Sequence, residues 1–185
     1  VVASKLGRSA INVDQNKRYV QVAKERLKDV TELANPDSTV EIVEGDSKNL
    51  SFIPSDSVSL VVTSPPYWDK ADYGSGKNDI GRRDTYVAFL ENMRSVFQEC
   101  FRVLEPGRKI CVNTANVNQF TEHGLLTFPI AADFCVILRE IGFLMVNELI
   151  WSKDKTGGRW GSANMQRPIF GSYPYPPNFL FKNVH

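Results

Sequence analysis

The sequence contains only three cysteines and two histidines among its 185 residues, and their spacing excludes several kinds of site. The cysteines, Cys100, Cys111 and Cys135, stand singly in apolar segments without the paired spacing of a zinc site. An odd number of cysteines also argues against a disulfide framework. We therefore expect core cysteines in a cytosolic protein, surface positions for His123 and His185, and no metal site.

The sequence also lacks a long hydrophobic run. Its best candidate for a membrane span, "FCVILREIGFLMV", is interrupted by Arg139 and Glu140, whereas a spanning helix needs about 20 apolar residues. Signal-peptide features, internal repeats and low-complexity tracts are missing as well. With 42% apolar composition, residues 1–185 are expected to form a single globular domain with no membrane partner.

The small net charge of +1 hides an uneven distribution of charges. Residues 151–185 hold five basic side chains and one acidic side chain, whereas residues 1–150 hold 17 basic and 20 acidic ones. Basic groups beside aromatic rings can hold phosphates and unstacked bases. The segment 152–185 is therefore expected to face DNA, although a solvated loop is the alternative. The candidate contacts are Lys153, Lys155, Arg159, Trp160 and Arg167, with a weaker claim for Arg82 and Arg83.

Strand and helix patterns alternate along the chain. The opening "VVASKLG" has the pattern of a helix end closed by Gly7. Strands are predicted over 8–14, 39–43, 57–63, 109–113 and 143–151, and helices over 16–33, from a cap at Asp84 to 104, and over 128–141. This order predicts an α/β fold with a mostly parallel sheet and helices on both faces. Ligands of such sheets bind beyond the carboxyl ends of the strands.

Three loops follow predicted strands at that edge. Asp14 suits either a helix N-cap or a contact with the two hydroxyls of a ribose. The pair Gly45-Asp46 suits either a plain turn or a site. The third loop, Ser64-Pro65-Pro66-Tyr67, starts where two prolines must end the strand near Thr63, because proline donates no backbone hydrogen bond. Three such loops at one edge indicate a ligand site.

The stretch "TSPPYW" resembles the catalytic motif of the DNA amino-methyltransferases, which use S-adenosylmethionine (SAM) to methylate an exocyclic nitrogen of a base. The flanking segments "VEIVEGDSKNLSFIPSDSVSLVV" and "YVAFLENMRSVFQECFRVLEPGRKICVN" extend the resemblance to about residues 3–151. It implies a Rossmann-like class I methyltransferase fold in the cytoplasm, with SAM as cofactor, double-stranded DNA as partner and a role in restriction-modification. The family's Gly-rich SAM loop and its strand are expected before residue 1, so the chain is expected to be a truncated catalytic domain.

The resemblance also implies roles for individual residues. Asp14 would hold the ribose of SAM, and Gly45-Asp46 the adenine, with Asp46 at its amino group. Ser64, Pro65, Pro66 and Tyr67 would form the catalytic loop, with Ser64 also bordering the cofactor. The Ser64 hydroxyl and the Pro65 carbonyl would accept hydrogen bonds from the two N–H groups of the target amine. These hydrogen bonds would make its nitrogen a better nucleophile. Tyr67 would stack on the flipped-out base, and Trp68 would either extend this wall towards DNA or pack in the core.

The resemblance leaves the target base open. Serine at position 64 is the commoner pattern among cytosine enzymes, which favours the N4 nitrogen of cytosine. The N6 nitrogen of adenine is the alternative. Methylation at carbon 5 of cytosine is disfavoured because that chemistry needs a cysteine nucleophile after a proline, and no cysteine here follows one. A catalytically silent DNA-binding fragment and an RNA methyltransferase are the remaining alternatives.

Overall fold

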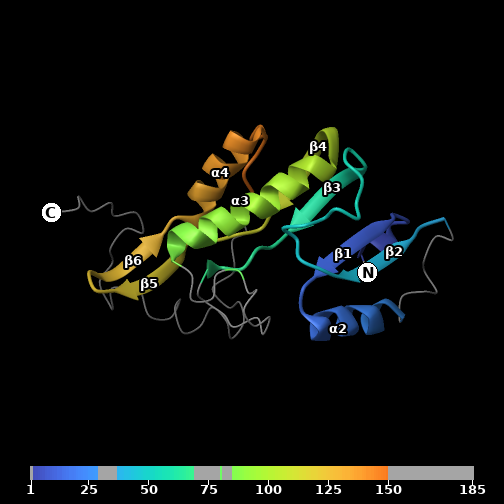
Figure 1. Cartoon of the computed structure of the whole chain (residues 1–185), viewed down its shortest axis with the longest axis horizontal. Helices are drawn as coiled ribbons and strands as arrows, with labels where there is room; N and C mark the ends of the chain where they lie inside the picture. The colour runs from blue at the N-terminus through green and yellow to red at the C-terminus, as the bar shows by residue number, and fades with distance from the viewer. Residues whose placement is uncertain (1, 29–36, 69–79, 81–84, 150–185) are drawn as a thin grey trace. The chain divides into compact units, whose positions relative to one another are not determined.

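The computed structural model describes residues 2–28, 37–68, 80 and 85–149. The chain divides into two units, Val1–Met145 and Val146–His185, and every described helix and strand belongs to the first (Figure 1). Their order is α1 (Val2–Lys5), β1 (Ala10–Asp14), α2 (Lys17–Lys28), β2 (Val40–Glu44), β3 (Val58–Thr63), α3 (Tyr86–Val103), β4 (Leu104–Val112), β5 (Val117–Thr121), β6 (Gly124–Phe128) and α4 (Ile130–Ile141).

The first four strands form two parallel pairs. β1 pairs with β2 along its whole length, from Ala10 opposite Val40 to Asp14 opposite Glu44. β3 pairs with β4, and the ladder is regular where Leu60–Thr63 faces Lys109–Val112. The predicted parallel strands are therefore confirmed, although in the described part of the chain the two pairs stand as separate two-stranded sheets.

The start of β4 departs from a regular ladder. Val58 lies opposite Leu104, and Leu60 lies opposite Lys109, so four residues of β4 (105–108) stand against the single residue Ser59 of β3. Gly107, at φ 79°, lies inside this irregularity and supplies a left-handed conformation that most residues avoid. Residues 105–108 therefore form an irregular interruption within β4.

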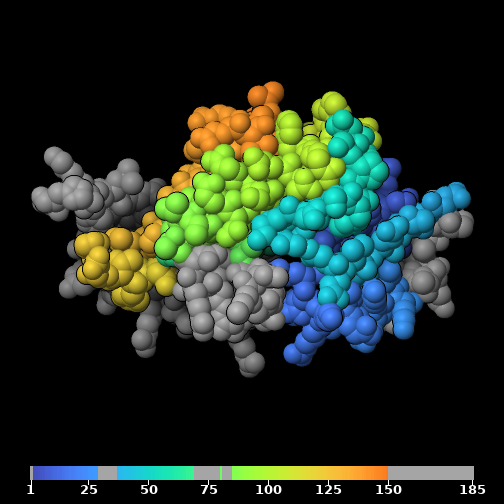
Figure 2. Space-filling model, in the orientation of Figure 1, coloured from blue at the N-terminus to red at the C-terminus, as the bar shows by residue number. Residues whose placement is uncertain are grey.

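Among the described helices and strands, α3 has the most buried side chains. Phe89, Met93, Val96 and Phe97 are almost completely buried on it, and they pack with residues of α4 such as Phe134. The two helices lie side by side in Figure 1, and Figure 2 shows the outer side chains of α3 between those of α4 and β3.

The N-terminus of α3 corrects one prediction. The N-cap is Thr85, whose hydroxyl accepts a hydrogen bond from the Ala88 amide at 3.2 Å, so the predicted cap at Asp84 is wrong by one residue. A threonine can cap a helix because its side-chain oxygen satisfies one of the free amides of the first turn.

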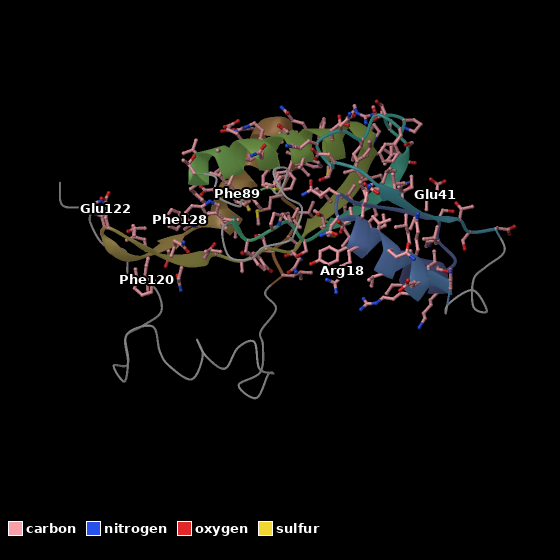
Figure 3. All side chains as sticks on the ribbon, turned by 60° about the horizontal axis from the view of Figure 1, so that its bottom comes forward. Arg18, Glu41, Phe89, Phe120, Glu122 and Phe128 are labelled. Carbon is pink, nitrogen blue, oxygen red and sulfur yellow. The ribbon has the colours of Figure 1, made fainter. Side chains whose placement is uncertain are left out.

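A β-hairpin between β4 and α4 was not predicted. β5 and β6 pair antiparallel, from Val117 opposite Phe128 to Thr121 opposite Gly124. The hairpin has two unlike faces, since Val117 is buried, whereas Phe120 is 81% exposed. Figure 3 shows Phe120 and Phe128 on this hairpin, and Phe128 packs against Trp68 and Tyr86.

The predicted strand over 143–151 is wrong where the structure describes it. Residues 143–149 form neither strand nor helix, and Leu144 is 87% exposed. A strand needs a neighbour for its backbone hydrogen bonds, and in the described part of the chain this segment has none. Helix α4 instead ends at Gly142, where φ is 122° and the Phe143 amide donates to the Leu138 carbonyl at 3.0 Å, as in a Schellman cap.

The cysteine prediction is confirmed for one residue and wrong for two. Cys100 is buried on α3, whereas Cys111 and Cys135 are exposed. His123 lies at the surface of the hairpin turn as expected. Among the described residues, no helix combines the length and the apolar character that a bilayer crossing requires.

Candidate active site

A pocket of about 370 Å³ lies where β1, β2 and β3 end at their carboxyl termini. Its lining comes from the three strand ends and loops that the sequence analysis selected, from one face of α3, from Tyr19 of α2 and from Ile80. The lining residues are Val13, Asp14, Gln15, Tyr19, Gly45, Ser47, Thr63, Ser64, Pro65, Pro66, Ile80, Met93 and Val96. The structure thus brings together predicted site residues that are up to about fifty positions apart in the sequence.

Asp14 lines the pocket and is not the N-cap of α2. One carboxylate oxygen of Asp14, Oδ1, accepts the Asn16 amide at 2.8 Å. The Asn16 side chain in turn accepts the Arg18 amide at 2.9 Å, which is the hydrogen bond of an N-cap. The two interpretations of Asp14 are thereby separated, because Asn16 caps the helix and Asp14 ends β1 at the pocket.

Gly45 and Asp46 occupy different positions relative to the pocket. Gly45 lines it, and its amide donates to the Asp14 carbonyl at 3.1 Å. Asp46 is absent from the lining, and its Oδ1 accepts the Lys48 amide at 2.9 Å, which forms a local turn. Ser47 takes the next lining position. The interpretation of Asp46 as a turn residue is therefore confirmed, and its predicted contact with adenine stays a prediction.

The surroundings of the loop after β3 change at Tyr67. Ser64, Pro65 and Pro66 line the pocket, whereas Tyr67 and Trp68 are half-buried and pack against the core between α3 and α4. The structure thus supports a packing role for Trp68. Its backbone has φ 41°, a left-handed conformation that is uncommon for a bulky side chain.

Asn113 is a site residue that the sequence analysis missed. Its amide donates to the Thr63 carbonyl at 2.9 Å and extends the β3–β4 ladder by one step. Its side-chain Nδ2 donates to the Ser64 hydroxyl oxygen at 3.4 Å, a long hydrogen bond. The sequence signal was its place directly after the strand "KICV", but the contact joins residues 49 positions apart.

The loop between β2 and β3 is held by an ion pair on α3. The Arg102 guanidinium donates to both carboxylate oxygens of Glu99 at 2.9 Å and to the carbonyls of Leu50 and Ile53 at 2.8 and 3.0 Å. Glu99 also accepts the Leu50 amide at 2.7 Å. The hydrogen bonds from Arg102 hold the pKa of Glu99 below its ordinary value. This clamp ties the segment that begins at Gly45 to the helix behind the pocket.

The predicted DNA contacts other than Trp68 lie outside the described residues. They are Lys153, Lys155, Arg159, Trp160 and Arg167, together with Arg82 and Arg83. Within the part of the chain that the structure covers, the residues that commonly bind metals form no group of three or more able to hold an ion.

Comparison with known proteins gives a consistent result. A family model described as DNA methylase, N6_N4_Mtase, matches residues 58–179. The chain is 25% identical over 170 residues to the Type II beta methyltransferase M.BslI of a Bacillus species, covering 84% of this chain and 17% of that protein. It is 26% identical over 160 residues to the Type II methyltransferase M.MjaI of Methanocaldococcus jannaschii, covering 74% and 50%.

One solved structure extends the comparison to the fold. TTHA0409 from Thermus thermophilus, assigned as a DNA modification methylase and solved in complex with SAM, matches with a TM-score of 0.50 and 33% identity. The match covers 75% of this chain and 48% of TTHA0409. The chain therefore spans half or less of the length of each of these proteins.

Proposed function

The chain belongs to the DNA methylase family, and on that premise we propose that it carries the catalytic core of an enzyme that methylates an exocyclic amino nitrogen in DNA, with SAM as methyl donor. The observation that carries the proposal is the pocket at the ends of β1, β2 and β3. It brings the carboxylate of Asp14 to the same cavity as the loop Ser64-Pro65-Pro66.

The pocket has the size of a small-molecule site and side chains suited to the adenosine part of SAM. Its volume of about 370 Å³ lies within the range of roughly 300–1,000 Å³ that small-molecule sites occupy. The Asp14 carboxylate would accept the ribose hydroxyls, and the apolar side chains of Ile80, Met93 and Val96 would cover the flat adenine ring. Bound SAM would supply a methyl group on a positively charged sulfur. Asp46 Oδ1 accepts the Lys48 amide, so the proposed contact with the adenine amino group would use Oδ2, which lies 3.7 Å from the Lys48 ammonium.

The loop after β3 would activate the amine. The amino nitrogen of a base is a poor nucleophile because its lone pair is delocalised into the ring. Hydrogen-bond acceptors aimed at its two N–H groups would localise that lone pair on the nitrogen. The Ser64 hydroxyl oxygen and the Pro65 carbonyl are suited to accept these two hydrogen bonds. The fixed φ of proline holds that carbonyl in place before the base arrives. Asn113, which donates to Ser64 Oγ, would orient the hydroxyl.

Tyr67 would contact the base after it leaves the duplex. A base inside a duplex cannot reach a pocket at a sheet edge, so the proposal requires base flipping. Tyr67 directly follows the pocket-lining prolines, and its half-buried ring packs partly against the core. The proposed stacking on the flipped base would use the part of the ring that is still exposed.

The proposed target is the N4 nitrogen of cytosine, with the N6 nitrogen of adenine as the alternative. Serine at position 64 supports cytosine as the target, because it resembles the commoner pattern of the cytosine enzymes. The hydrogen-bond acceptors of the loop suit the amino group of either base. The proposed enzyme acts on double-stranded DNA as the methyltransferase of a restriction-modification system in the cytoplasm.

Mass spectrometry of the methylated nucleosides tests the proposal. The protein that contains this chain would be incubated with DNA and SAM, and the DNA digested to nucleosides. N4-methylcytosine is the expected product, N6-methyladenine would select the alternative, and 5-methylcytosine or no methylation would contradict the proposed chemistry. Ser64→Ala should lower the rate by about 10²-fold, as the loss of one transition-state hydrogen bond does elsewhere. Ser95→Ala is the control, because that hydroxyl bonds within α3 and should leave the rate unchanged.

A further inference from the structure

The residue that follows the proposed catalytic loop has a constrained backbone. Trp68 adopts φ 41°, a region that bulky residues rarely occupy. Such a conformation persists only where the surroundings hold it, and it is found most often near functional sites. Trp68 directly follows Tyr67, so whatever fixes Trp68 also fixes the end of the loop.

Three aromatic rings from separate segments meet at that position. The Trp68 ring lies 4.5 Å from Phe128 and 5.2 Å from Tyr86, measured between ring centroids, and Tyr86 lies 4.8 Å from Phe128. Interplanar angles of 56° to 66° give tilted and edge-to-face contacts, the arrangements that aromatic pairs prefer. Phe128 ends β6 and Tyr86 begins α3. We call these three residues the aromatic bracket.

A hydrogen bond ties the bracket to a fourth segment. The Tyr86 hydroxyl donates to Asp133 Oδ2 at 2.5 Å, and Asp133 lies in the first turn of α4. Burial, together with the Asp133 carboxylate, raises the pKa of Tyr86 well above its ordinary value. The hydroxyl therefore stays protonated and remains a donor throughout the physiological pH range.

We propose that the aromatic bracket and Asp133 position the catalytic loop, so that Tyr86 and Asp133 are positioning residues of the methyl transfer. The proposal rests on the proposed function. Thr63, at the start of the loop, is held by the Asn113 amide, and Trp68 is held at its other end by the bracket. With both ends fixed, the acceptors at Ser64 and Pro65 stay in place for the amine. Trp68 then acts through packing and makes no contact with DNA.

Steady-state kinetics on the protein that contains this chain test the proposal. Tyr86→Phe keeps the ring and removes the hydrogen bond, and Asp133→Ala removes the acceptor. Each change should lower kcat by about tenfold and leave KM for DNA and SAM within about twofold. Asp133→Asn keeps an acceptor oxygen and should retain most of kcat. The double variant Tyr86→Phe, Asp133→Ala should be no slower than either single variant, because both remove one interaction.

The control removes a different aromatic contact of α3. Phe101 makes an edge-to-face contact with Phe143 at 5.0 Å, so Phe101→Leu should lower the melting temperature and leave kcat unchanged. Unchanged kcat in Tyr86→Phe and Asp133→Ala would overturn the proposal. Independent, additive losses in the double variant would overturn it as well.

Fluorescence gives a readout that does not depend on activity. Replacing every other tryptophan of the protein that contains this chain by phenylalanine, Trp151 and Trp160 among them, leaves Trp68 as the only indole reporter. Adding Tyr86→Phe should shift the emission to the red and increase quenching by acrylamide, whereas Phe101→Leu should change neither. If the emission responds but the parent protein transfers no methyl group, the proposed function fails and the bracket stands. If methyl transfer occurs and Tyr86→Phe changes neither emission nor kcat, the bracket fails alone.

Discussion

Two aspartates at strand ends have the same local hydrogen bond but different access to the pocket. Asp14 and Asp46 each accept the amide two residues further along through Oδ1. Only Asp14 lines the pocket. A carboxylate can serve both a turn and a ligand because its two oxygens offer about four acceptor positions. At Asp14 the turn therefore leaves acceptor capacity for a ligand.

Substitutions at Asp14 can separate these two roles. Asp14→Asn keeps an oxygen that can accept the Asn16 amide but removes the charge, so it should weaken SAM binding by about tenfold and leave the melting temperature unchanged. Asp14→Ala removes both acceptors and should also lower stability by about 1 kcal/mol. Calorimetric titration and thermal unfolding of the protein that contains this chain measure the two effects. Asp56→Asn makes the same change of charge outside the pocket lining and is the control.

At the scale of helices and strands, periodic patterns predicted α3 and the paired strands β1, β2 and β3. The apolar repeat of Leu90, Met93 and Phe97 predicted α3, and those side chains pack in or against the core that α3 shares with α4. The hairpin β5–β6 was missed because its turn, Glu122-His123, lacks the Asn-Gly type of signal. Gly124, at φ 95°, was the available clue.

The limit of sequence reasoning at the site has a different physical cause. Asp14, Gly45 and Ser64 could be selected because each lies at the end of a strand or directly after one, and parallel strands end at one edge. Asn113 and the Tyr86–Asp133 pair could not, since their hydrogen bonds join residues 47 to 49 positions apart. Side-chain contacts at that separation depend on how helices and strands pack, and no local pattern in the sequence records it.

The clamp between α3 and the loop after β2 predicts a dependence of stability on pH. The pKa of Glu99 is lowered in the folded state by Arg102 from its ordinary value of 4.5, so the carboxylate stabilises the fold at pH values above that ordinary value. The contribution is lost as the pH falls through the lowered folded-state pKa. Glu99→Gln should therefore lower the melting temperature by a few degrees at pH 7, and its difference from the unsubstituted protein should shrink in acid.

Thermal unfolding from neutral pH into acid measures this dependence. Glu91→Gln is the matched control, because Glu91 lies on the same helix and its pair with Arg94 is exposed and 3.6 Å long. Exposed pairs of this kind contribute little to stability. A Glu99→Gln deficit that stayed constant across the pH range would show that the carboxylate charge has no part in the clamp.

At the scale of the whole molecule, the net charge is positive in the C-terminal segment 151–185 and negative in residues 1–150. We propose that Lys153, Lys155 and Arg159 contact DNA phosphates in the protein that contains this chain. Replacing all three by alanine should weaken DNA binding and flatten its dependence on salt, by roughly 0.9 in the log–log slope for each phosphate that is no longer neutralised. SAM affinity should stay constant. Binding titrations across a salt series measure the slope.

The control for this prediction removes the same charge elsewhere. Alanine at Lys5, Lys24 and Arg26 takes three positive charges from α1 and α2 and should change the slope much less. Equal slopes for the two triple variants would attribute the effect to net charge alone. If the salt dependence of DNA binding were unchanged in the C-terminal variant, the alternative of a solvated loop without DNA contacts would hold.

The unequal burial of the three cysteines makes the protein report its own unfolding. Cys111 and Cys135 are open to a thiol reagent in the native state, whereas burial in α3 raises the pKa of the Cys100 thiol to about 11 and shields it. Only the thiolate reacts quickly. Two fast modifications would therefore be followed by a slow third one. Where the reagent reacts faster than the protein recloses, the rate of the third equals the rate at which the region around Cys100 opens. The rate at which Cys100 is modified therefore measures how long the region around this residue stays folded.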